Sequence, residues 1–480
     1  MHLVFLWAWM ISIAIGMFQM GYCSAMFSSF LDILHTQLGE AGRAVIGDSE
    51  NFNSVMTTAI PLGAVFGSLT GGCLVSYGRR KAIIWINVVL CFGTALSMIF
   101  NFFTILIGRI IVGFCVGVLT VVCPMFLSET SLVKLAGPIG GLNQVMVTVG
   151  IMVGYFFGFL APLKLDLENN PNPTVKTTNS WRFVFMIPAF VAIIQSLLLI
   201  IVFTDDTPKY YRLIGKERHA RRIELLTNPD FNERDLILTK EVRSQEQKVS
   251  ICKNFDPYHR KAFIIGCVLA VFQQLTGINV VILYSAKYIE FGQENETHDV
   301  LVLARMGTTI IGVINCISAI AAIFLLAKFG RKPLMIISNI GMCFCLIALA
   351  VWPKSQNSSY LIAFAIVFII FFEIGMGSAI FMYATEIMTE FGISIALSIT
   401  WILTTLVSLL TFKTLGYFNQ RDLYFIFLGI NLLGLLFLIF FIKETKGESK
   451  ESLKYLYSKV PYEEILTAKL NATESTSPFI

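Results

Sequence analysis

Four uncharged polar side chains stand close together inside an apolar run at residues 271–285, which reads VFQQLTGINVVILYS. They are Gln273, Gln274, Thr276 and Asn279. An amide buried in hydrocarbon without a partner costs roughly 2–7 kcal/mol, so this group needs either a ligand or a neighbouring helix. Amides and hydroxyls both donate and accept hydrogen bonds, which favours a neutral, hydroxyl-rich ligand over an ion. The alternative is a polar seam that joins two membrane helices.

Gly277 bears on whether these side chains can reach one small ligand. On a straight helix Gln273 and Asn279 would point about 240° apart, at ~100° per residue. A residue without Cβ tolerates an unwound turn, and such a turn would bring the two ends of the run together. The sequence therefore predicts a helix broken at Gly277.

The elements that position this group are expected to be membrane helices. Of the 480 residues, 56% are hydrophobic and 14% are charged, and the mean hydropathy is +0.73. This composition excludes an ordinary soluble domain. Since a span needs ~20 apolar residues, we expect an all-α membrane protein with twelve transmembrane helices. They lie near 3–27, 53–76, 82–104, 105–128, 137–161, 182–204, 262–286, 301–327, 333–352, 360–385, 392–415 and 421–443.

Lysine and arginine gather in alternate loops, and the net charge is +5. The positive-inside rule then places both termini in the cytoplasm, and we expect the plasma membrane. The most charged segment, 205–261, interleaves acids with bases, so it indicates a solvated helical linker and no nucleic-acid surface. The expected parts are a six-helix bundle at 1–204, the linker at 205–261, a second six-helix bundle at 262–443 and a cytoplasmic tail at 444–480.

Two short motifs occur once in each half of the chain. Gly330-Arg331-Lys332 in the second half corresponds to Gly78-Arg79-Arg80 in the first, with 331 − 79 = 252 positions between the arginines. Glu386 likewise corresponds to Glu129, and the two glutamates are 386 − 129 = 257 positions apart. The repeat predicts two pseudo-symmetric bundles, and parallel repeats of this kind place a substrate site near mid-membrane between the halves.

The charged ends of the repeats suggest a latch. An arginine at the end of one span and a glutamate at the end of another can pair on the cytoplasmic side and hold the halves together while the outer side is open. The alternative is that these ion pairs only hold the loops in place and do not change between states. The residues expected to take part are Arg79, Arg80, Glu129, Arg331, Lys332 and Glu386.

Three further polar residues stand inside apolar spans. Gln19 is an isolated amide that either caps a neighbouring helix or faces a cavity, and we favour the cavity. Gln144 is one more buried amide. Glu373 is an intramembrane acid, and such charges are costly enough to indicate a functional role.

The remaining residues exclude several functional classes. The five histidines lie at loop or terminal positions without a paired nucleophile, which argues against an enzyme. No GxxxxGK[ST] phosphate loop occurs, so an ATP-driven pump is not expected. Cys343 and Cys345 form a C-x-C in a membrane helix without partner ligands, and we expect core packing there. We therefore expect no cofactor and no metal; the oligomeric state is left open.

These motifs resemble the sugar porter branch of the major facilitator superfamily, and especially the facilitative glucose transporters. The resemblance covers nearly the whole chain. It rests on the run Gln273–Asn279 with Tyr284-Ser285, the paired GRR and GRK turns, Gly108-Arg109, Trp181-Arg182 and Glu444-Thr445-Lys446-Gly447. It implies a sugar substrate and the major facilitator fold in a lipid bilayer.

The resemblance also implies roles for single residues. It implies ligand support or gating by Glu373, and Phe381 stands where the family has a tryptophan. Gln19 matches a pocket position of the first span. Direct sugar contacts are implied for Gln144, Gln273, Gln274, Asn279 and Asn315.

The sequence departs from the family pattern at several positions. Two latch arginines are replaced by Ala136 and Ile393, which predicts a weaker latch. The break in the tenth span rests on glycines alone, Gly375 and Gly377. Where related symporters carry an aspartate, this chain has Cys23, which does not carry protons at ordinary pH. We expect a facilitative hexose transporter working by alternating access; a proton-coupled sugar symporter and a sugar-binding sensor are the alternatives.

Overall fold

The computed structural model describes residues 2–31, 33–35, 37–38, 49–131, 136–161, 179–227, 256–279, 281, 298–351, 358–414, 420–448, 450–453 and 455–458. Every regular element within these residues is a helix. Eleven of the described helices are long and apolar enough to cross a membrane. The seventh expected span begins as the shorter α13 (Arg260–Gln274), and most of its second half, with Tyr284 and Ser285, lies outside the described residues. The expected all-α membrane fold is confirmed.

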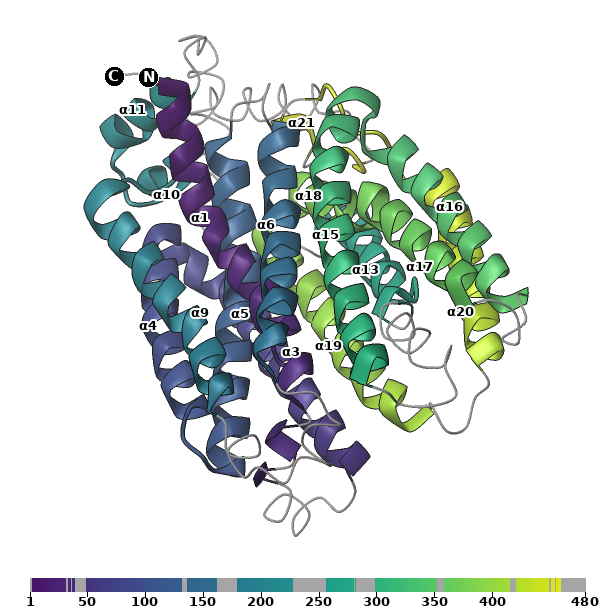
Figure 1. Cartoon of the computed structure of the whole chain (residues 1–480). Helices are drawn as coiled ribbons and strands as arrows, with labels where there is room; N and C mark the ends of the chain where they lie inside the picture. The colour runs from purple at the N-terminus through teal and green to yellow at the C-terminus, as the bar shows by residue number, and fades with distance from the viewer. Residues whose placement is uncertain are drawn as a thin grey trace, which may run out of the picture.

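The helices form two groups that stand side by side (Figure 1). The first group packs around α5, most of whose residues are buried. It consists of α1 (His2–Ala25), α3 (Ser49–Leu74), α4 (Arg79–Ser97), α5 (Phe102–Thr130), α6 (Ala136–Phe157) and α9 (Ser180–Leu197).

The second group begins with α13 and contains one interrupted span. Its helices are α15 (His298–Phe329), α16 (Arg331–Val351), α17 (Ser358–Phe372), α18 (Ala379–Ile387), α19 (Glu390–Thr414) and α20 (Gln420–Phe441). A π-helical turn, η7 (Glu373–Gly377), joins α17 to α18 and interrupts the tenth span at its glycines. We call the two groups the first and second bundle.

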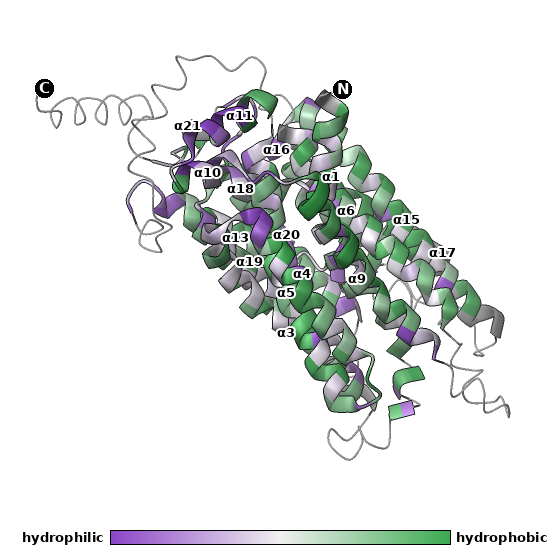
Figure 2. Cartoon of the chain, turned by 90° about the vertical axis from the view of Figure 1, so that its left-hand side faces the viewer, coloured by the Kyte–Doolittle hydropathy of each residue, from purple (hydrophilic) through white to green (hydrophobic). Residues whose placement is uncertain are grey.

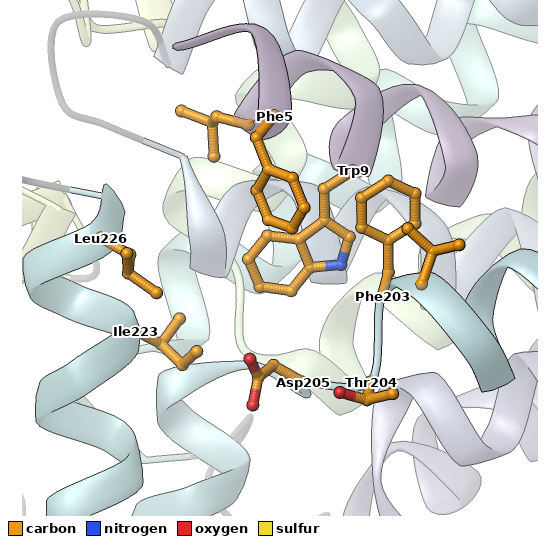
Figure 3. A pocket seen from close by; sticks show the side chains of 9 residues that line it. Phe5, Trp9, Phe203, Thr204, Asp205, Ile223 and Leu226 are labelled. Carbon is orange, nitrogen blue, oxygen red and sulfur yellow. The ribbon is translucent and has the colours of Figure 1, made fainter. Parts of the chain in front are cut away.

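One end of the molecule is distinctly hydrophilic. The short helices α10 (Pro208–Leu213), α11 (Glu217–Thr227) and α21 (Lys450–Leu453) lie at the end where α1 begins (Figure 1). Figure 2 shows hydrophilic residues gathered there and hydrophobic residues along the long helices. We call this the linker end. Here Ile223 and Leu226 of α11 face Phe5 and Trp9 of α1 across a small surface pocket (Figure 3), so the linker rests on the first helix.

The two motif-bearing turns have the same geometry, which confirms the internal repeat. Gly78 and Gly330 both take positive φ, +113° and +91°. In the first bundle the carboxylate of Asp206 accepts the backbone N–H of Arg80 at 3.1 Å. In the second, Glu444 accepts the first two backbone N–H groups of α16 at 3.0 and 2.9 Å. A carboxylate therefore stabilises the N-terminus of α4 and of α16, where the helix dipole is positive.

The boundary expected between the third and fourth spans was wrong by several residues. The stretch 82–104 was expected to be one helix, but α4 ends at Ser97. Asn101 starts the next helix because its side chain accepts the backbone N–H of Phe103 at 2.9 Å. An asparagine cap outweighs the continuous apolar pattern at this point.

Candidate functional site

The polar run of the seventh span is broken at Gly277, as the sequence predicted. The helix α13 ends at Gln274, and Gly277 has a φ of +91°. The break brings Asn279 back over the helix end, where its Nδ2 donates to Gln274 Oε1 at 3.2 Å. A Cβ at Gly277 would lie 2.9 Å from the Phe427 ring of α20, so both backbone angle and space require glycine.

The amides of this run keep bonding capacity for a ligand. Gln273 is 4% exposed, and among the described residues its Oε1 has no hydrogen-bond partner. Gln274 and Asn279 bond each other, and neither bonds another described helix. Thr276 differs, because its hydroxyl donates its hydrogen to the Gln273 carbonyl at 2.8 Å and so has no hydrogen left to donate to a ligand. Buried acceptors are normally satisfied, so Gln273 Oε1 is suited to accept a ligand hydroxyl.

A second polar contact joins the two bundles directly. Gln144 of α6 donates from Nε2 to both carboxylate oxygens of Glu373 in η7, at 3.2 and 3.1 Å. Glu373 is 2% exposed. Among the described residues no basic side chain pairs with it. A carboxylate held only by an amide can exchange that amide for another neutral donor, such as a hydroxyl.

The glycines of η7 explain how the carboxylate reaches this position. A Cβ at Gly375 would clash with Ser338 of α16, so the turn packs directly against that helix. A Cβ at Gly377 would lie 2.9 Å from Glu373 Oε2 and would crowd the carboxylate. The two glycines therefore let a charged side chain turn back over its own helix.

The neighbouring helix α15 adds one further amide. Asn315 is 5% exposed, and its Oδ1 has no partner among the described residues. The next residue, Cys316, lies near Thr148 of α6 and near Glu373. Phe381 of α18 is half-buried and packs against a hydrophobic cluster that contains residues of both bundles. Residues on α6, α15 and η7 thus converge at the boundary between the bundles.

Gln19 lies elsewhere, inside the first bundle, where its amide contacts another helix of that bundle. Its side chain is 0% exposed; Nε2 donates to Gln195 Oε1 of α9 at 3.4 Å, and Oε1 has no hydrogen-bond partner among the described residues. Gln195 in turn donates to the Ser12 carbonyl at 2.9 Å and accepts from Asn87 at 3.1 Å. The capping alternative is therefore the one that the structure shows. A complementary amide on α9, which residue spacing does not reveal, binds Gln19 inside the first bundle.

The expected ion pairs form at the linker end, but the latch is built differently from the prediction. Arg79 binds Glu129 at 2.8 Å, and both residues belong to the first bundle. The contact between bundles comes from Glu390 of α19, which the sequence analysis missed. Its carboxylate binds Arg79 at 2.8 Å and Lys209 of α10 at 2.7 Å. The side chain of Arg79 is 0% exposed, so this charge is compensated within the protein.

The second-bundle residues of the predicted latch also stay within their own bundle. Arg331 binds Glu386 at 2.5 Å. Lys332 donates from Nζ to the Ile439 carbonyl, and Arg80 donates from Nε to the Leu199 carbonyl. Arg80 and Lys332 are therefore helix-end caps, because each reaches a backbone carbonyl of its own bundle before any carboxylate of the other.

Two ionisable groups near Glu390 have displaced pKa values. Partial desolvation of the half-exposed Lys209 ammonium would lower its pKa, but the carboxylates of Glu390 and Glu129 outweigh this and raise the pKa above its ordinary value. Burial raises the pKa of Asp206, against the opposing effect of the Thr207 backbone N–H and of Arg79. Lys209 is thus held in its charged form at neutral pH, which suits it to bind Glu390.

Small residues close the linker end between α3 and α19. The hydroxyls of Ser68 and Ser398 share a hydrogen bond of 2.8 Å. One turn away, a Cβ at Gly72 would clash with Ser394. Each helix thus offers two small residues four positions apart, a pattern that permits close packing in membranes and could have been found in the sequence. The bundles are in direct contact at this end.

The comparisons agree with this architecture. A family model described as sugar (and other) transporter matches residues 9–457. The chain is 28% identical over 461 residues to hexose transporter 1 of Plasmodium knowlesi, covering 92% of this chain and 90% of that protein. It is 28% identical over 454 residues to the glucose transporter GlcP of Staphylococcus epidermidis, covering 92% and 95%.

A solved structure resembles the whole fold. It is that of the proton:xylose symporter XylE bound to 6-bromo-6-deoxy-D-glucose, which matches with a TM-score of 0.82 at 22% identity. The match covers 95% of this chain and 100% of that one. At this identity the likeness bears on the fold, and the side chains must be argued from their own geometry.

Proposed function

This chain belongs to the sugar (and other) transporter family, and on that premise we propose that it carries a hexose by uniport. It is a multi-pass membrane transporter of the major facilitator superfamily and no enzyme. The proposal further places the protein in the plasma membrane with the linker end in the cytoplasm. A hexose is favoured by the similarity to a hexose transporter and a glucose transporter and by the neutral amides described above.

The observation that carries the proposal is the hydrogen bond between Gln144 and Glu373 across the two bundles. A sugar hydroxyl can replace the amide donor, while Gln273 and Asn315 each offer an acceptor without a described partner. Each such bond contributes a net ~0.5–1.5 kcal/mol. A handful of them supplies the roughly −4 kcal/mol that corresponds to a dissociation constant of about 1 mM, weak enough for release.

Alternating access follows from where the contacts between the bundles lie. The linker end is held by Glu390 with Arg79 and by the small residues of α3 and α19. Opening this end requires those contacts to break together. At mid-membrane, Glu373 would then exchange the Gln144 amide for a hydroxyl of the sugar. Binding of a sugar between the bundles shifts the balance only as far as the two states bind it differently.

Uniport is supported by the surroundings of Arg109. Cys23, not an acid, is the electrostatic neighbour of this buried arginine among the described residues. A second candidate, proton-coupled import, is supported by the buried acid Glu373, which could bind a proton. A pH gradient separates the two: uniport predicts equal uptake with and without it, and with a protonophore.

The test of the pocket is sugar counterflow in proteoliposomes. We expect Gln274→Ala and Asn279→Ala to reduce glucose counterflow at least tenfold with the protein still folded in the membrane. Gln19→Ala is the control, because its amide belongs to helix packing; it should lower the melting temperature and leave the sugar affinity within about twofold. Normal counterflow in both pocket variants would refute the assignment, and a panel of hexoses, pentoses and polyols identifies the substrate.

A further inference from the structure

A buried arginine in the first bundle is used by neither the proposed sugar site nor the latch. Arg109 stands 109 − 102 = 7 residues into α5, about 10 Å from the helix start. It is 4% exposed. Its Nε donates to the Met56 carbonyl at 3.1 Å, and its guanidinium carbon lies 3.4 Å from the centre of the Phe27 ring. Among the described residues, no carboxylate and no second acceptor binds it.

The guanidinium borders a small pocket between α4, α5 and α9. Its free space suits a particle no larger than a small ion or a water molecule, and it is otherwise lined mostly by apolar side chains. Two hydroxyls join Arg109 in the lining. Thr94 is 2% exposed and its hydroxyl has no partner among the described residues, whereas Ser97 donates to the Gly93 carbonyl at 3.0 Å. A buried positive charge and an unpartnered hydroxyl therefore belong to residues that line one small, partly open space.

Electrostatics decides what can occupy that space. Removing a charge from water without a counter-charge is among the costliest events in folding, and the aromatic face of Phe27 offsets only part of this. A water molecule could satisfy the hydroxyl of Thr94 but adds no negative charge. A divalent anion would overcompensate a single cation, and a bulky organic anion exceeds the space.

We propose that this pocket binds one small monovalent anion, of the halide class, as the counter-ion of Arg109. The guanidinium N–H groups and the Thr94 hydroxyl donate to the anion, and Ile60, Val112 and Phe185 exclude bulk water. The site is separate from the sugar-binding amides and does not depend on the proposed function. Its role is to stabilise the first bundle, so folding stability depends on chloride.

Thermal unfolding of the full chain in detergent tests the proposal. Chloride is titrated against gluconate at constant ionic strength, since gluconate is too large for the pocket. The melting temperature is expected to rise saturably, by about 2–4 °C. Equal melting temperatures in chloride and gluconate would overturn the proposal.

Variants separate the site from a general salt effect. Cys23 is the electrostatic neighbour of Arg109, so Cys23→Asp supplies a fixed counter-charge and should abolish the chloride response while the protein stays folded. Cys23→Ser removes the thiol without adding charge and should keep the response. Thr94→Val should weaken it. A response that survives unchanged in Cys23→Asp would contradict the assignment.

Two further results bear on the same site. Asp32 lies outside the described residues and is the acid nearest to Phe27 in the sequence. A chloride response that appears only in Asp32→Asn would identify Asp32 as the native counter-ion and overturn the proposal. Crystals grown in bromide should show anomalous density beside Arg109, and density consistent with water alone would likewise overturn it.

Discussion

Glu390 is the residue whose replacement tests the linker-end contact most directly. We predict that Glu390→Gln shifts the protein toward the state in which the linker end is open. The variant keeps the shape of the side chain and removes the charge that binds Arg79 at 2.8 Å and Lys209 at 2.7 Å. The remaining amide can accept a hydrogen bond, so the loss is that of charge assistance.

The expected magnitude follows from the burial of the two partners. A hydrogen bond to a charged group contributes about 1.5–3 kcal/mol. Lys209 is 46% exposed, so solvent screens its ion pair with Glu390, and that pair contributes only about 0–1 kcal/mol. Arg79 is 0% exposed but keeps Glu129, so it is not left uncompensated. The total is about 2 kcal/mol, which corresponds to a roughly 30-fold change in the equilibrium between the two states.

Hydrogen–deuterium exchange in lipid nanodiscs measures this change. Exchange should accelerate in Glu390→Gln as the linker end opens to water, at residues 67–77, which form the end of α3 and the 3-10 turn Val75–Tyr77, and at residues 390–401 of α19. The matched control is Glu386→Gln, which makes the same chemical change at an ion pair within the second bundle. If both variants exchanged at the same rate, or if Glu390→Gln matched the unaltered protein, the bridging role of Glu390 would be wrong.

Two further substitutions test close packing. Gly72→Ala should force α3 and α19 apart, because its Cβ clashes with Ser394, and should increase exchange at the linker end; Gly137→Ala, with open space around it, should not. Gly277→Ala should lower the free energy of unfolding by roughly 1–3 kcal/mol, because φ is +91° and Phe427 is close. Its control, Gly429→Ala in α20, meets nothing within 4 Å and should leave stability equal or higher by thermal unfolding.

Much of the fold follows from local properties of the chain. Apolar stretches of span length define the membrane helices, and most expected boundaries agree with the structure to within a few residues. The break at Gly277 was predictable because it depends on one residue without Cβ inside a polar run. The repeat indicated that these arginines and glutamates form ion pairs at one end of the molecule, but the prediction that the pairs join the two bundles was wrong, because Arg79–Glu129 and Arg331–Glu386 each lie within one bundle. Each of these features depends on residues that belong to one bundle.

The partners across the bundles were decided only by tertiary structure. Arg79 and Glu390 are 311 positions apart, and Gln144 and Glu373 are 229 apart. Glu390 has no counterpart in the repeat, since position 390 − 257 = 133 is a valine. The amide of Gln19 could have faced a cavity or bonded a neighbouring helix. It bonds α9 because the packing of the first bundle places Gln195 beside it. A residue's type fixes which bonds it can make, but the packing of distant helices determines which partner comes within reach.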